Sequence, residues 1–184
     1  MNTVADSENS AVPLRSTFVI KLAGHTKKRL FKERKAQMKA SQGKLGRIFV
    51  LRLEDGDVIP GCIERFAEEK GILAGYVTLL GGIGSGQIVA GPKRSEAISP
   101  QPIVVPIKDA YEMLGVGVLA PNKEGKPILH LHTALGREEQ TITGDPRYGI
   151  TLRLVGEVIL HEISNISMAR IKDEQSGLSL LEIE

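Results

Sequence analysis

The chain lacks the features that would place it outside the cell or in a membrane. Cys62 is the one cysteine among 184 residues, so no disulfide can form within the chain, and such cysteine usage is typical of a reducing cytosol. No apolar run approaches the roughly 20 residues that span a bilayer. Asp6 and Glu8 stand where a secretory signal would carry positive charge. We therefore expect a cytoplasmic protein that does not engage a membrane.

The chain also has no large net charge, although its basic and acidic residues are unevenly distributed along the sequence. The 24 Lys and Arg residues and 22 Asp and Glu residues leave a net charge of +2. Residues 1–44 contain ten basic and three acidic residues, a net +7, so the other 14 basic and 19 acidic residues give 45–184 a net −5. We therefore divide the chain into a basic N-terminal extension, residues 1–45, and one folded domain, residues 46–184.

The basic segment has two interpretations, and the sequence leaves both open. Residues 25–44 read HTKKRLFKERKAQMKASQGK, with many helix formers and few large apolar side chains. The segment either contacts DNA by neutralising phosphates, without sequence specificity, or is a solvated extension that rests at most on the acidic body of a neighbouring subunit. Phe31 is its one aromatic residue, so base stacking has little support. The candidate nucleic-acid contacts are Lys27, Lys28, Arg29, Lys32, Arg34, Lys35 and Lys39.

After Gly46 the pattern becomes that of a sheet protein. Alternating or continuous apolar segments predict strands at 47–54, 72–80, 87–91, 102–107, 111–121 and 148–164. Helical spacing along VIPGCIERFAEEKG (58–71) predicts one helix. The run GGIGSG (81–86) lacks the lysine of a phosphate loop and predicts a sharp bend between two strands. Many strands and one helix predict a single α+β domain with a largely antiparallel sheet.

The segment ILHLHTALGREEQTITGD (128–145) carries the main candidate for chemistry. Residues i and i+2 of a strand point to the same face, so His130 and His132 share one face while the intervening leucines face a core. We expect Gly136–Glu139 to form a four-residue turn that pairs His130 with Asp145. Paired residues have Cβ atoms about 4.5–5.5 Å apart, which would set the carboxylate beside the imidazoles.

Two imidazoles and one carboxylate would form a three-ligand site with an open position. Catalytic zinc sites have this arrangement, and non-haem iron accepts the same ligands. The alternative is a pair of surface histidines without a ligand, because an odd change in loop length would turn Asp145 to the opposite face. His161 is either a fourth ligand or a core or edge histidine that makes one hydrogen bond.

Several segments resemble the PPC domain, the plant-and-prokaryote-conserved domain that also occurs with AT-hooks in plant nuclear proteins. They are GRIFVLRLEDGDVIPGCIERFAEEKGI, YEMLGVGVL, GKPILHLHTALG and RIKDEQSGLSLLEI, and they span about 46–184 in the right order. The resemblance implies a compact α+β subunit that assembles as a homotrimer. It also implies, as in many prokaryotic members, a metal site on both histidines of His-x-His and a third histidine after Gly-Gly. Here TGD (143–145) puts Asp145 in the third ligand's place.

Two functions are compatible with these residues. The first is a PPC-domain protein that binds a divalent metal, preferably zinc, and has a DNA-associated or regulatory interaction role. The second is a metal-dependent lyase or hydrolase acting on a small carbonyl or carboxylate substrate, implied by the family's similarity in fold to acetolactate decarboxylase. A bound metal would polarise a carbonyl or activate water, and a proton-transfer group must then lie within reach. Glu112 is the candidate for that group, although structural pairing explains it equally well.

Overall fold

A computed structural model describes residues 38–183, which form one domain with a single helix and ten strands in the described part. The elements are β1 (Lys44–Glu54), β2 (Val58–Ile59), α1 (Gly61–Glu69), β3 (Gly75–Pro92), β4 (Pro102–Ile107), β5 (Tyr111–Pro121), β6 (Pro127–Arg137), β7 (Gln140–Gly144), β8 (Ile150–Ser164), β9 (Met168–Lys172) and β10 (Ser179–Ile183). Within residues 38–183, no helix is long and apolar enough to cross a membrane.

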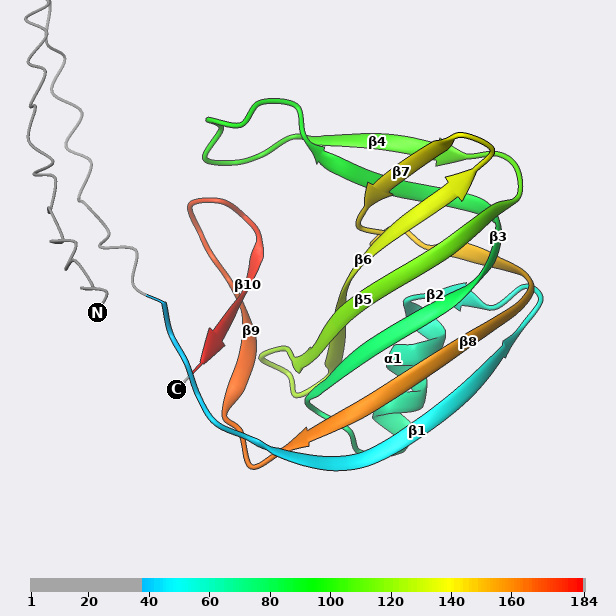
Figure 1. Cartoon of the computed structure of the whole chain (residues 1–184). Coiled ribbons are helices and arrows are strands. Elements are labelled where there is room, and N and C mark those ends of the chain that lie inside the picture. The colour runs from blue at the N-terminus through cyan, green and yellow to red at the C-terminus, as the bar shows by residue number, and fades with distance from the viewer. Residues whose placement is uncertain (1–37, 184) are drawn as a thin grey trace, which may run out of the picture. The chain divides into compact units, whose positions relative to one another are not determined.

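Eight strands form one antiparallel sheet in the order β1-β8-β3-β5-β6-β7 (Figure 1). β2 adds to β8, and β4 adds to β3. The last two strands, β9 and β10, form a separate two-stranded hairpin. This architecture confirms the expected α+β class with a largely antiparallel sheet.

The core lies between α1 and one face of the sheet (Figure 1). Ile63 and Ala67 are one helical turn apart and fully buried, and they belong to the same hydrophobic cluster as Val77 of β3. The Glu64 carboxylate accepts a hydrogen bond of 2.8 Å from the backbone N–H of Leu129. This bond ties the helix directly to β6, the strand that carries the paired histidines.

The glycine run GGIGSG does not separate two strands, so that expectation is wrong. The run lies inside β3, and the pairing of β3 with β8 shifts register twice within it. Gly81 has a φ of +148°, and a Cβ there would lie 2.6 Å from the Val155 carbonyl oxygen. Glycine therefore permits the close approach of β3 and β8, and the strand bends through bulges without ending.

Candidate functional site

The two histidines lie on β6 as the period-two pattern predicts. Leu129 and Leu131 are buried in the core, whereas His130 and His132 are exposed on the opposite face of the sheet. The Nε2 atoms of the two imidazoles are 3.3 Å apart, and the rings are inclined at 81° to each other. Both nitrogens therefore point toward a common region of space.

The turn between β6 and β7 is shorter than the expected four residues. Arg137 pairs with Gln140, which leaves a two-residue turn. The pair farthest from the turn is Thr133 with Gly144. The next position in this register places Asp145 opposite His132, whereas the expected partner of Asp145 was His130. Because the turn differs by an even number of residues, Asp145 stays on the face of the histidines. Its Oδ2 atom lies 3.9 Å from Nε2 of His130.

Asp145 is held by backbone and side-chain contacts. Its N–H donates to the Val89 carbonyl at 2.9 Å, and its own carbonyl accepts from the Val89 N–H at 2.8 Å. The residue is only 7% exposed. Arg147 donates to Oδ2 from Nε at 3.0 Å and from Nη2 at 2.6 Å. The carboxylate is therefore fixed beside the imidazoles by β3 on one side and a guanidinium on the other.

The electrostatic surroundings favour a neutral His130. Its pKa is lowered, first by burial and next by the positive charge of Arg170, while Asp145 opposes the shift. Arg170 lies on β9 and is 6% exposed, and burial lowers its own pKa as well. A neutral imidazole has a free nitrogen lone pair, which is the form that binds a metal ion.

The donor set fits a divalent cation. One nitrogen from each histidine and one oxygen of Asp145 all lie within 4.8 Å of one another. Two nitrogens bound to zinc at about 2.0–2.1 Å in a tetrahedral arrangement would lie about 3.3 Å apart, which matches the separation of the two Nε2 atoms. The carboxylate oxygen is somewhat farther away, with Oδ2 of Asp145 at 3.9 Å from Nε2 of His130.

The other predicted site residues lie elsewhere. His161 of β8 pairs with Ile48 and Tyr76, and its ring centroid is 6.0 Å from that of Tyr76. Two strands, β3 and β5, lie between β8 and β6. Glu112 is opposite Gly136, four residues along the sheet from the level of His132, or about 13 Å at the usual rise. The structure does not bring either one to the imidazoles.

Most of the predicted nucleic-acid contacts lie outside the described residues. These are Lys27, Lys28, Arg29, Lys32, Arg34 and Lys35. Lys39 is described, and its ammonium group forms an ion pair with Glu182 of β10.

Sequence reasoning missed the two arginines of the site. Arg147 follows Asp145 by two residues, and this spacing alone could have drawn attention to it. Arg170 follows 25 residues after Asp145 in the sequence, and no local pattern signals that β9 lies beside the histidines. Both arginines line a pocket of about 330 Å³ together with His130 and Asp145.

The sheet face that carries the histidines is unusually apolar where solvent reaches it. Cross-strand pairing aligns Val50, Ile159, Thr78, Val116 and His132 in one row. The exposed apolar side chains of this face, which we call the apolar stripe, are Ile48, Val50, Tyr76, Leu80, Leu114, Val116, Val118 and Ile159.

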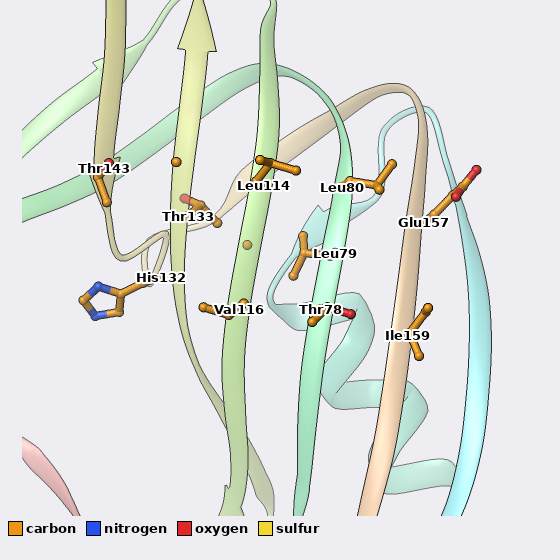
Figure 2. Close-up of a pocket in the computed structure, with 12 residues that line it drawn as sticks. Thr78, Leu79, Leu80, Leu114, Val116, His132, Thr133, Thr143, Glu157 and Ile159 are labelled. Carbon is orange, nitrogen blue, oxygen red and sulfur yellow. The ribbon is translucent and has the colours of Figure 1, made fainter. Parts of the chain in front are cut away.

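A groove follows the apolar stripe across the sheet. Figure 2 shows it running from His132 on β6 to Glu157 on β8, and its volume is about 490 Å³. A sheet with one face in water normally turns polar side chains outward. A contiguous exposed apolar patch of this kind marks an interaction surface.

The fold and the donor cluster define an antiparallel α+β domain with a candidate metal centre on its open sheet face. The family of the Plants and Prokaryotes Conserved (PCC) domain, also written PPC, matches residues 40–164. Since that match covers more than half of the 184 residues, the chain belongs to this family. No curated protein matches the chain in sequence.

Solved structures share the fold over nearly their whole length. A metal-containing protein from Archaeoglobus fulgidus is 28% identical, with a TM-score of 0.68 over 79% of this chain and 99% of that chain. A PPC protein from Pyrococcus horikoshii is 26% identical, with a TM-score of 0.68 over 80% and 99%. A candidate DNA-binding protein from Bacteroides thetaiotaomicron is 19% identical, with a TM-score of 0.62 over 78% and 99%, and shows the fold alone.

Proposed function

We propose that the chain is a metal-binding PPC-domain protein of the cytoplasm with a regulatory or DNA-associated interaction role. Its divalent cation, zinc in the first instance, is held by His130, His132 and Asp145. The observation that carries this proposal is the convergence of two imidazole nitrogens and one carboxylate oxygen within 4.8 Å. The description of the Archaeoglobus fulgidus relative as metal-containing supports it.

Zinc is preferred because of the ligand types and their number. Imidazole and carboxylate groups both suit zinc, and three protein ligands with a free position are typical of its open sites. Iron(II) also takes two histidines and one carboxylate, with more open positions. A metal at this site supplies a Lewis acid that attracts an anionic or carbonyl oxygen.

Elemental analysis of the full chain, purified without chelators, tests the metal proposal. We expect about one divalent ion per chain, because three ligands on a folded scaffold bind zinc tightly. His130→Ala should reduce the bound metal at least ten-fold, because two ligands cannot hold the ion against water. His161→Ala is the matched control and should leave the metal content unchanged. A wild type that stays metal-free after dialysis against zinc, or equal losses in both variants, would contradict the proposal.

The apolar stripe supports self-association, and we propose the homotrimer that the family resemblance implies. Val116 at the centre of the stripe is 54% exposed, and the exposed residues two positions before and after it on β5, Leu114 and Val118, are also apolar. Exposed apolar area of this kind is removed from water when copies associate, at about 25 cal/mol for each Å² buried. A trimer closes by a three-fold axis, so each copy uses the stripe once against a different surface of the next copy.

The DNA-associated part of the proposal rests on charge, with residues 1–45 as an extension from the domain at 46–184. Residues 1–44 carry +7 and residues 45–184 carry −5, so any phosphate contact falls to the extension. Lys39 already pairs with Glu182, which leaves the other six predicted contacts to carry the binding.

Fluorescence anisotropy with a short duplex tests this interaction. Six phosphate contacts predict a slope of about −5 in the plot of log affinity against log salt concentration, with no preference for sequence. Replacing Lys27, Lys28, Arg29, Lys32, Arg34 and Lys35 with glutamine should abolish the binding. The matched control neutralises Lys70, Lys93, Arg94, Lys108, Lys123 and Lys126 in the domain and should retain it. Equal weakening by both variants would contradict a role for the extension.

An enzymatic role, as a lyase or hydrolase on a small carbonyl or carboxylate substrate, has less support. Glu112 is about 13 Å along the sheet from the imidazoles by strand geometry. Among the described residues, Asp145 is the one carboxylate that lines the pocket beside His130, and it is the proposed metal ligand. We therefore place binding and regulation ahead of catalysis.

A further inference from the structure

Arg170 is a buried cation with an unused hydrogen-bond donor. The residue is 6% exposed, and its Nη2 donates to the carbonyl oxygen of Val118 at 3.0 Å. Its Nε is buried and has no hydrogen-bond partner among the described residues. An unsatisfied charged donor in a protein interior is costly and rare. A polar ligand beside the guanidinium group would reduce this cost.

The neighbouring carboxylate does not satisfy this donor. Asp145 attracts Arg170 electrostatically, but its Oδ2 atom already accepts two hydrogen bonds from Arg147. Two guanidinium groups, those of Arg147 and Arg170, and one carboxylate, that of Asp145, line the pocket. These three side chains together carry one net positive charge.

The pocket has both polar and apolar lining residues. The charged or titratable ones are Arg147, Arg170, His130 and Asp145, while Ile128, Leu178 and Leu180 contribute apolar side chains. Its volume of about 330 Å³ is at the small end of the range for ligand sites, about 300–1,000 Å³. Such a lining favours a small organic anion with an aliphatic part over inorganic phosphate.

We propose that this pocket binds a small aliphatic carboxylate, whose carboxylate group accepts hydrogen bonds from the guanidinium groups of Arg170 and Arg147. Charge-assisted bonds from guanidinium to carboxylate are among the strongest in proteins. The inference rests on the proposed metal site in one respect only, that the ligand lies beside the cation held by His130. Arg170 belongs to β9, beyond residues 40–164 that the family matches.

NMR titration of the full-length protein with butyrate tests the proposal directly. The neutral amide butyramide has nearly the same shape and should bind at least ten-fold more weakly, because it lacks the charge that the arginines recognise. Inorganic phosphate serves as the second anion. The titrations are carried out on protein as purified and on protein dialysed against a chelator.

Two substitutions separate the role of Arg170 from general charge effects. Arg170→Met removes the charge and keeps the length, and it should weaken butyrate binding roughly 10- to 100-fold. Arg94→Met is the matched control, since Arg94 pairs with Glu96 in an exposed loop, and it should bind butyrate as the wild type does. The unliganded melting temperature of Arg170→Met should be equal to or above that of the wild type, because a buried unsatisfied donor is removed.

A second measurement follows Arg170 in the wild-type protein. In wild-type protein labelled with ¹⁵N at arginine, butyrate should shift the Nε–H resonance of Arg170 downfield, and butyramide should not. Arg170→Lys, which keeps the charge but lacks that resonance, provides the assignment.

The outcomes of these titrations support or overturn the carboxylate-binding proposal. Unchanged butyrate affinity in Arg170→Met would overturn the proposal, because binding would then not involve Arg170. Binding of phosphate without butyrate would overturn the carboxylate assignment. Butyrate binding that depends on Arg170 in chelator-treated protein supports the pocket even where elemental analysis finds no metal, so the two proposals fail separately.

Discussion

Gly144→Ala is expected to lower the free energy of unfolding by more than about 3 kcal/mol and to abolish metal retention. A Cβ at residue 144 would lie 2.2 Å from the Val89 carbonyl oxygen and 2.7 Å from its carbon. The obstacle is backbone, so it cannot rotate away. The strands must separate, which breaks the two hydrogen bonds between Asp145 and Val89 and moves the carboxylate away from the imidazoles.

Gly136→Ala is the matched control for this substitution. Gly136 lies in the same hairpin, and a Cβ there would meet nothing closer than 3.9 Å. Alanine should change stability by less than about 1 kcal/mol and leave the metal content intact. Urea unfolding curves and elemental analysis measure the two effects. Similar stability in both variants would mean that close packing of Gly144 against Val89 does not position Asp145.

Val116→Glu is expected to convert the assembled protein to monomers. Burying an unpaired carboxylate in an apolar contact costs several kcal/mol for each copy, and a closed assembly repeats that cost at every interface. Light scattering after size-exclusion chromatography should give about three times the chain mass of 19.9 kDa for the wild type. The variant should elute at the mass of one chain.

The same change elsewhere on the surface separates assembly from folding. Val58 on β2 is 46% exposed and lies outside the apolar stripe, so Val58→Glu should remain assembled. Far-ultraviolet circular dichroism of both variants should match the wild type, since each side chain already faces solvent in the isolated chain. A monomeric wild type, or assembly that survives in Val116→Glu, would contradict the proposed role of the stripe.

The sequence was sufficient to predict that both histidines lie on the same face of the sheet. It was not sufficient to predict the long-range contacts around them. The period of two along β6 fixes His130 and His132 on one face whatever the rest of the chain does. Asp145 was predicted on that face from a turn two residues longer than the observed one, and the prediction survived because the error was even. An error of one residue would have reversed it.

The parts that could not be predicted depend on residues far apart in the chain. The contact of Val89 with Asp145 requires β3 to continue through GGIGSG, where local glycine content indicated a bend between strands. The burial of Arg170 depends on where the last hairpin packs, and neither strand of that hairpin carries a strong periodic signal. Tertiary packing decides both features, and local propensity is a weak guide to it.

The link between Val89 and Asp145 also bears on solubility. It joins the far half of β3 to the end of β7, so β3, β5, β6 and β7 close into a ring. Without that bridge, the amide and carbonyl groups of Asp145, directly after β7, would be unpaired and open to pairing with an extended peptide, the usual starting point for aggregation of sheet proteins. The contact that orients a proposed metal ligand thus also removes one pair of free backbone groups at the edge of the sheet.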